Sequence, residues 1–180
     1  MSYEISTYSK IRIDPFKPKK ELILLEDIAH ALSLICRANG HTKHFYSVGL
    51  HSVNCALEAE ERKLTQRTQL ACLLHDASEA YLCDITRPVK CRLPNYLEIE
   101  LGMQNMVWEA FGLNYLTGEE QLMVDEIDDA MLFYEFESLK GERLDGMTAK
   151  LLRAPDFEFI DFAKVEQKFI ALANRLMINL

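Results

Sequence analysis

Hydrophobic residues recur at steps of three and four along most of the chain, which is the period of an amphipathic helix. The first such stripe predicts a helix that stops before Gly40 and carries Leu25, Ile28, Ala29, Leu32, Ile35 and Cys36. Thr117 and Glu120 have the spacing of a capping box, which predicts the start of another helix. The same period predicts further helices over residues 47–62, 65–82 and 96–111, and a last one with Phe162, Val165, Phe169, Leu172 and Leu176 on its apolar face.

The segments between these stripes predict irregular structure. Residues 1–20 are polar, and Pro15 and Pro18 interrupt any helix there. Residues 83–94 contain two prolines and three basic residues, which predicts a loop. No segment shows the alternation typical of a strand. We therefore expect an all-α chain, residues 1–180 forming a single helical bundle of irregular connectivity, with its active site between helices.

Composition narrows the range of partners. The chain has 180 residues and a formal net charge of -8, so it lacks the basic surplus that binding to long nucleic acid or to an anionic membrane requires. A small phosphorylated substrate remains compatible, since one or two placed cations suffice. The five cysteines form no C-x-x-C pair and no apolar run reaches membrane-spanning length, which predicts a reducing, cytoplasmic location.

Candidate chemistry centres on adjacent His75 and Asp76, in a stretch otherwise made largely of leucine, alanine and cysteine. Side chains of neighbouring helical residues point about 100° apart, so both can approach one ion, and Glu79 follows one turn later. The simpler alternative is that these groups form the solvated side of an amphipathic helix. His51 in an earlier helix and Asp128 in a later one favour a metal site, because ligands from three helices can close around an ion in a bundle.

The order His51, His75-Asp76, Asp128 resembles the H…HD…D signature of the HD-domain metal-dependent phosphohydrolase superfamily. The resemblance extends over residues 27–135. Three segments, GHTKHFYSVGLHS, LLHDASEAYLCDITRPVK and VDEIDDAMLFYE, are similar to those of the small, single-domain bacterial 5'-deoxynucleotidases in this superfamily. The resemblance implies that these four residues are metal ligands.

Three positions qualify this resemblance. Asp128 is preferred to its neighbour Asp129 because Glu135, seven residues later, matches an acidic position of the family. Cys83 stands where the nucleotidases have a glycine before their catalytic acid, and Leu50 where they commonly have glutamate. Both departures concern the surroundings of the substrate, and neither removes a ligand.

The resemblance implies catalytic roles for two further acids, Asp84 as general acid/base and Glu79 as its helper and as a substrate-orienting group. Two histidines and two carboxylates form a mixed nitrogen and oxygen site, which suits one divalent ion of Mn, Co, Fe or Zn better than Mg. Such an ion lowers the pKa of a bound water and polarises a phosphate.

Several basic residues are candidate substrate contacts. Arg37 lies fourteen residues before His51, where related enzymes place a phosphate-binding arginine, although a surface arginine near a helix end is an equal alternative. His41, Arg87 and Lys90 either contact the substrate or are ordinary loop residues.

Taken with the resemblance, these residues lead us to expect a phosphohydrolase that converts a deoxynucleoside 5'-monophosphate to nucleoside and phosphate. A dNTP triphosphohydrolase is a close alternative. From other classes, a non-catalytic metal-bearing regulatory or binding module and a helical scaffold with solvated acids stay open. Apolar positions on the last helix favour a homodimer.

Overall fold

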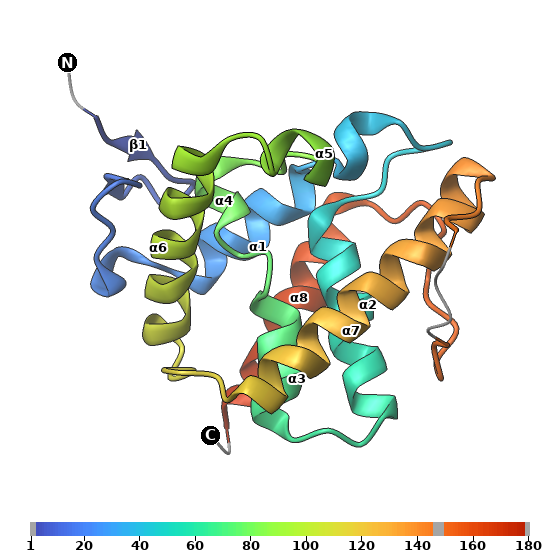
Figure 1. Ribbon diagram of the computed structural model, residues 1–180. Helices are drawn as coiled ribbons and strands as arrows, with labels where there is room; N and C mark the ends of the chain where they lie inside the picture. The colour runs from blue at the N-terminus through green and yellow to red at the C-terminus, as the bar shows by residue number, and fades with distance from the viewer. Residues whose placement is uncertain (1–2, 146–149, 179–180) are drawn as a thin grey trace.

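The computed structural model describes residues 3–145 and 150–178 and confirms the all-α fold (Figure 1). Three short helical turns accompany the α-helices: η1 (Lys20–Leu22), η2 (Arg37–Gly40) and the π-helical η3 (Phe136–Lys140). The α-helices are α1 (Leu25–Leu34), α2 (Val48–Glu61), α3 (Gln66–Leu74), α4 (Glu79–Leu82), α5 (Arg87–Lys90), α6 (Pro94–Ala110), α7 (Gly118–Glu135) and α8 (Phe162–Met177).

Helix α2 is the centre of the bundle, where it packs against α1, α3, α7 and α8 (Figure 1). Ser47 caps its start by accepting a hydrogen bond from the Leu50 amide, and most of its residues are buried. Gly49 permits the close approach to α1, because a Cβ at this position would lie 3.1 Å from the backbone of Leu32. A central helix buried on most sides can bring side chains from several helices together around it.

The apolar face of α8 is buried inside the same bundle. Val165, Phe169, Leu172 and Leu176 are at most 8% exposed, and α8 packs on α1, α2 and α3. These four residues therefore stabilise the chain itself, whereas Phe162, the first residue of the expected apolar face, is 45% exposed. The homodimer stays a prediction, and the buried residues of α8 no longer support it. Among the described residues, no helix combines the length and the apolar character needed to cross a membrane.

The helix expected over residues 65–82 is interrupted, and this corrects the sequence-based expectation. Helix α3 ends at Leu74 and α4 begins at Glu79. Between them the chain forms turns, in which the Ala77 amide donates to the Leu74 carbonyl and the Glu79 amide donates to the Asp76 carbonyl. The side chain of Gln104, from α6, enters the break: its Nε2 donates to the Leu74 carbonyl at 2.8 Å and its Oε1 accepts from the Ser78 amide at 3.0 Å. A side chain inserted in this way replaces backbone hydrogen bonds of the helix and allows the chain to bend.

Three other expectations about elements need correction. Two strands of two residues each, β1 (Ile5–Ser6) and β2 (Arg12–Ile13), pair antiparallel in the N-terminal segment, and they are too short to show alternation. Part of the segment expected to be a loop forms α5, which begins next to a proline, where a missing N–H costs nothing. The first helix ends at Leu34, well before Gly40, because the following residues pair with residues 46–48.

Candidate metal centre

The four candidate ligands come from three elements that meet around α2. His51 is fully buried on α2, and Asp128 lies on α7. His75 and Asp76 lie directly after α3, at the break that Gln104 stabilises. The adjacent histidine and aspartate therefore occupy a turn rather than the middle of a helix.

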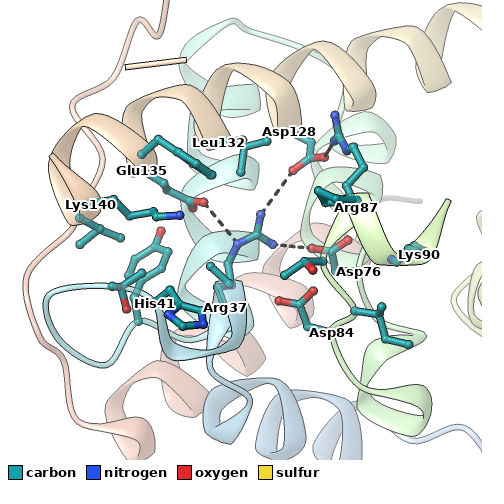
Figure 2. Close-up of a pocket in the computed structure, with 18 of the residues that line it drawn as sticks. Arg37, His41, Asp76, Asp84, Arg87, Lys90, Asp128, Leu132, Glu135 and Lys140 are labelled. Atoms are coloured by element: carbon teal, nitrogen blue, oxygen red, sulfur yellow. Dashed lines mark hydrogen bonds and ion pairs between the residues drawn. The ribbon is translucent and has the colours of Figure 1, made fainter. Parts of the chain in front are cut away.

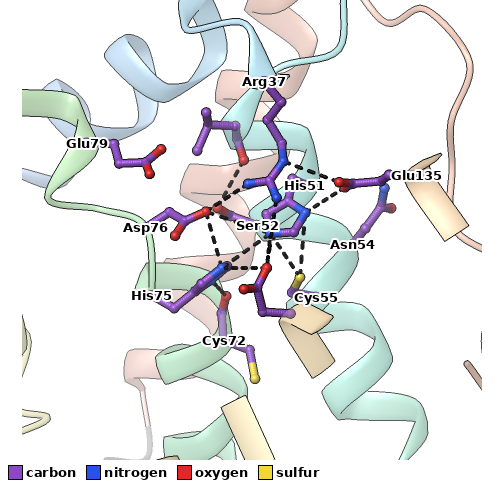
Figure 3. Close-up of polar contacts among 12 residues, drawn as sticks. Arg37, His51, Ser52, Asn54, Cys55, Cys72, His75, Asp76, Glu79 and Glu135 are labelled. Carbon is purple, nitrogen blue, oxygen red and sulfur yellow. Dashed lines mark hydrogen bonds and ion pairs between the residues drawn. The ribbon is translucent and has the colours of Figure 1, made fainter. Parts of the chain in front are cut away.

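The donor atoms of these four side chains converge, and Figure 3 shows His51, His75 and Asp76 pointing toward one another. Nε2 of His51 lies 3.2 Å from Nε2 of His75 and 3.1 Å from Oδ1 of Asp128. Oδ2 of Asp76 lies 3.3 Å from Nε2 of His75 and 3.7 Å from Nε2 of His51. Nε2 of His75 lies 3.6 Å from Oδ1 of Asp128. Side chains separated by up to 77 positions in the sequence therefore meet within a few ångström.

The other nitrogen of each imidazole is held by an acceptor. Nδ1 of His51 lies 2.6 Å from Oε1 of Glu135, and Nδ1 of His75 lies 2.8 Å from the carbonyl oxygen of Cys72. Burial alone raises the pKa of Glu135, but His51 and Arg37 outweigh it and leave this pKa below its usual value, so the carboxylate is ionised and accepts. Each Nδ1 then carries the hydrogen, which leaves both Nε2 atoms to face the centre, as in histidines that bind metals.

The charges at the centre depend on one another. Burial lowers the pKa of His75, but the carboxylates of Asp76 and Asp128 outweigh it and raise this pKa well above its usual value. Burial raises the pKa of Asp128, but hydrogen bonds with His51 and His75 outweigh it and hold this pKa well below its usual value. The two carboxylates therefore need positive charge beside them, which either protonated imidazoles or a cation can supply.

Cys55 is a nearby donor that the sequence analysis did not select. One donor atom from each of His51, Cys55 and His75 lies within 4.8 Å of the other two, an arrangement that can hold a metal ion. Sγ of Cys55 is 3.5 Å from Nε2 of His51, since the two residues are four positions apart on α2. That spacing was the available signal, but a buried cysteine is also an ordinary core residue.

Arg37 forms ion pairs with three carboxylates at the centre (Figure 2). Its Nη1 donates to Oδ2 of Asp76 at 3.0 Å, its Nε lies 3.3 Å from Oε2 of Glu135, and its Nη2 lies 3.9 Å from Oδ1 of Asp128. The side chain is only 13% exposed. This low exposure excludes the alternative of a surface arginine, and the guanidinium lies with these carboxylates in the wall of a cavity.

That cavity has a volume of about 520 Å³, and the candidate ligands Asp76 and Asp128 are among the residues that line it (Figure 2). One side of it is apolar and includes Leu132, Phe136 and Leu139. His51 and His75 are not among its lining residues, whereas eight other residues selected from the sequence are: Arg37, His41, Asp76, Glu79, Asp84, Arg87, Lys90 and Asp128. Two of the candidate ligands, both candidate catalytic acids and the candidate cations therefore share one cavity.

Glu79 is a buried carboxyl group in the wall of this cavity. It is 4% exposed, and its Oε2 has no hydrogen-bond partner among the described residues. Burial raises the pKa of Glu79 well above its usual value, and the charges of Asp76 and Asp84 add to this effect. Nζ of Lys90 lies 3.6 Å from its Oε1, but donates at 2.6 Å to Glu100. Glu79 therefore keeps its proton to a higher pH than an ordinary glutamate.

The aspartate doublet of α7 is divided between two environments. Asp128 points to the centre, whereas Asp129 accepts a hydrogen bond from Nη1 of Arg87 at 2.9 Å and is 47% exposed. Nη2 of Arg87 lies 3.4 Å from Oδ2 of Asp128. Of the pair, only Asp128 converges with the two histidines.

The fold and the candidate centre define an all-α protein with a side-chain cluster that can hold a metal ion. No model of a known protein family matches the chain. It is 39% identical over 109 residues to the uncharacterized protein YfdR of Escherichia coli K12, a match that covers 61% of this chain and 58% of YfdR. It is 37% identical over 107 residues to an uncharacterized protein of Rhodobacter capsulatus, covering 57% of this chain and 55% of that protein. The chain thus matches little more than half the length of these curated relatives.

Proposed function

We propose that this protein is a metal-dependent phosphohydrolase of the HD-domain type, which hydrolyses a deoxynucleoside 5'-monophosphate to nucleoside and phosphate. One observation carries the proposal: two imidazole Nε2 atoms lie 3.1–3.7 Å from each other and from two carboxylate oxygens, and both carboxylates line a cavity of about 520 Å³. Acids and cations that can act on a phosphate line the same cavity.

We assign the ion to His51, His75, Asp76 and Asp128 rather than to Cys55. Sγ of Cys55 lies 3.5 Å from Nε2 and 4.0 Å from Nδ1 of His51, so the sulfur is beside the ring and away from the lone pair of Nε2. Burial raises the pKa of the Cys55 thiol well above its usual value, and the Asp128 carboxylate adds to this, whereas metals bind the thiolate. This donor set fits one divalent Mn, Co, Fe or Zn ion, which when bound lowers the pKa of water and polarises a phosphate.

The cations of the cavity serve to bind the phosphate. A guanidinium has five N–H donors, and the hydrogen bond of Arg37 to Asp76 uses one, so Arg37 can hold phosphate oxygens while it stays bonded to that carboxylate. Arg87 and Lys90 supply further positive charge at the opposite side of the cavity from His41 (Figure 2). The apolar side of the cavity accommodates the nucleoside.

The two acids have different roles in the reaction. Asp84 lines the cavity and acts as the general base that takes the proton of the attacking water, then returns it to the leaving oxygen. Glu79 keeps its own proton and donates a hydrogen bond that orients the substrate. Asp84→Asn should lower turnover about 10²–10⁴-fold while the metal stays bound. Full activity in Asp84→Asn would remove Asp84 from the mechanism.

A panel of nucleotides tests the function. Deoxyribo- and ribonucleoside mono- and triphosphates are incubated with the protein and with Mn²⁺, Co²⁺ or Mg²⁺, and phosphate and triphosphate release are measured separately. We expect phosphate from deoxynucleoside monophosphates with Mn²⁺ or Co²⁺. Triphosphate release from dNTPs would instead identify the triphosphohydrolase. A protein that binds one metal ion per chain but hydrolyses none of these nucleotides would instead be the non-catalytic module.

A further inference from the structure

A second cavity, of about 470 Å³, lies against a different face of α2 from the one that carries His51 and Cys55. Its floor is apolar and is formed by side chains of α2, among them Leu50 and Leu57, together with Leu172 of α8. Ligand sites in proteins have this order of size, about 300–1,000 Å³, and this mixture of an apolar floor with a few polar groups. None of the residues assigned to the metal centre lines it.

Two buried polar side chains of α2 hold the outer wall of this cavity in place. The carboxylate of Glu58, 1% exposed, accepts hydrogen bonds from the amides of Leu152 and Arg153 at 2.9–3.1 Å. Asn54, 4% exposed, donates to the carbonyl of Asp156 at 3.0 Å and accepts from its amide at 3.3 Å. The segment 152–156 is therefore anchored over α2, and the cavity is preformed.

The rim of the cavity is basic in a chain whose net charge is -8. Three cations and one acid line it. Nζ of Lys168 lies 3.7 Å from Oδ2 of Asp156, and the guanidinium of Arg175 donates to both carboxylate oxygens of Glu60 at 2.7 and 3.0 Å. The guanidinium of Arg153 makes no hydrogen bond or close ion pair with any residue that the structure describes, although its charge adds to the hydrogen bond of Arg175 in lowering the pKa of Glu60. Its donors are therefore available to an anionic group.

We propose that this cavity is a second ligand site, for a small organic anion with an apolar body. The body packs on the leucines of the floor, and a carboxylate, sulfonate or phosphate head binds the guanidinium of Arg153, whose planar fork matches two oxygens at once. Lys168 adds positive charge from α8 on the same rim. The site is independent of the proposed phosphohydrolase activity.

An NMR titration of the full chain with 8-anilinonaphthalene-1-sulfonate tests the site. This probe joins an apolar ring system to one sulfonate. Saturable shifts are expected at the side-chain amide of Asn54 and at the backbone amides of residues 153–156 other than proline. Arg153→Glu should weaken binding of the probe at least tenfold, and Lys168→Glu should also weaken it. Lys164→Glu, on the same helix but outside the cavity, should change the dissociation constant less than twofold.

Competition with other anions then distinguishes an aliphatic carboxylate from a nucleotide phosphate as the ligand. Displacement of the probe by octanoate identifies an aliphatic carboxylate, and displacement by dAMP identifies a nucleotide phosphate. Absence of saturable shifts at these amides, or displacement by neither compound, would overturn the proposal. So would an Arg153→Glu variant that binds the probe as tightly as the unmodified protein, with its remaining amide spectrum unchanged.

Discussion

Replacement of Cys83 by glycine should stabilise this protein. Cys83 has φ 67° and ψ 159°, a region that glycine alone adopts without strain, and holding another residue there costs about 1–3 kcal/mol. Its side chain is exposed, so little packing is lost. Glycine also adds freedom to the unfolded chain, which offsets about 0.4–1 kcal/mol. The net gain is about 1 kcal/mol, which for 180 residues raises the thermal midpoint by about 2–4 °C.

Cys91 provides a matched control within the same chain. It is also exposed, but its φ of -66° and ψ of -10° are ordinary helical values. Cys91→Gly should therefore lower the midpoint, because only the entropic cost remains. Cys83→Ala should leave it almost unchanged, since alanine meets the same backbone strain. Calorimetry of the three variants decides the matter: a midpoint lowered by Cys83→Gly, or raised equally by Cys83→Ala, would refute the strain at this turn.

Three further predictions concern the centre and the helix packing. Glu135→Gln should weaken Co²⁺ binding about 10–100-fold in calorimetric titration, because it removes the carboxylate that orients His51; unchanged affinity would contradict this role. Asp128→Asn should abolish stoichiometric Co²⁺ binding while Asp129→Asn retains it, and equal losses would show that the doublet was misassigned. Gly49→Ala should destabilise the fold by about 1–3 kcal/mol, since its Cβ would meet the backbone of α1. Gly102→Ala, on an exposed face of α6, should instead stabilise by about 0.5–1 kcal/mol in urea unfolding.

Helical periodicity predicted the long elements well because it reflects local geometry. The helices expected over residues 47–62 and 96–111 agree with α2 and α6 within two residues at each end. The capping box at Thr117 is present, with both hydrogen bonds formed. These features depend on residues close together in sequence, and so the sequence contains the information directly.

The interrupted helix was not predictable from local sequence. The stretch around His75 has continuous helical character, and the break depends on Gln104, which is 26 residues from Ser78 and belongs to another helix. The same applies to the hydrogen bond between His51 and Glu135, which joins residues 84 positions apart. Glu135 entered the sequence analysis only as a guide to register, since nothing local indicates that it orients a histidine.

The candidate site itself was predictable in composition but not in detail. Its residues were selected from their spacing and from a resemblance, and the structure places eight of the ten in the lining of one cavity, with His51 and His75 against Asp128 and Asp76. The ion pairs of Arg37 with Asp76 and Glu135 required coordinates, because they depend on where the turn η2 directs the side chain. Cys55 was not selected from the sequence, and its proximity to His51 follows only once the helix is known to face the centre.

The most direct test of the proposed centre is phosphate release from a deoxynucleoside 5'-monophosphate, measured as Mn²⁺ or Co²⁺ is added back to protein freed of metal with a chelator. We predict that activity rises in proportion to bound metal, reaches its maximum at one ion per chain and is absent in His75→Ala. Activity that is independent of added metal, or that persists in His75→Ala, would contradict a hydrolytic metal centre formed by these histidines and aspartates.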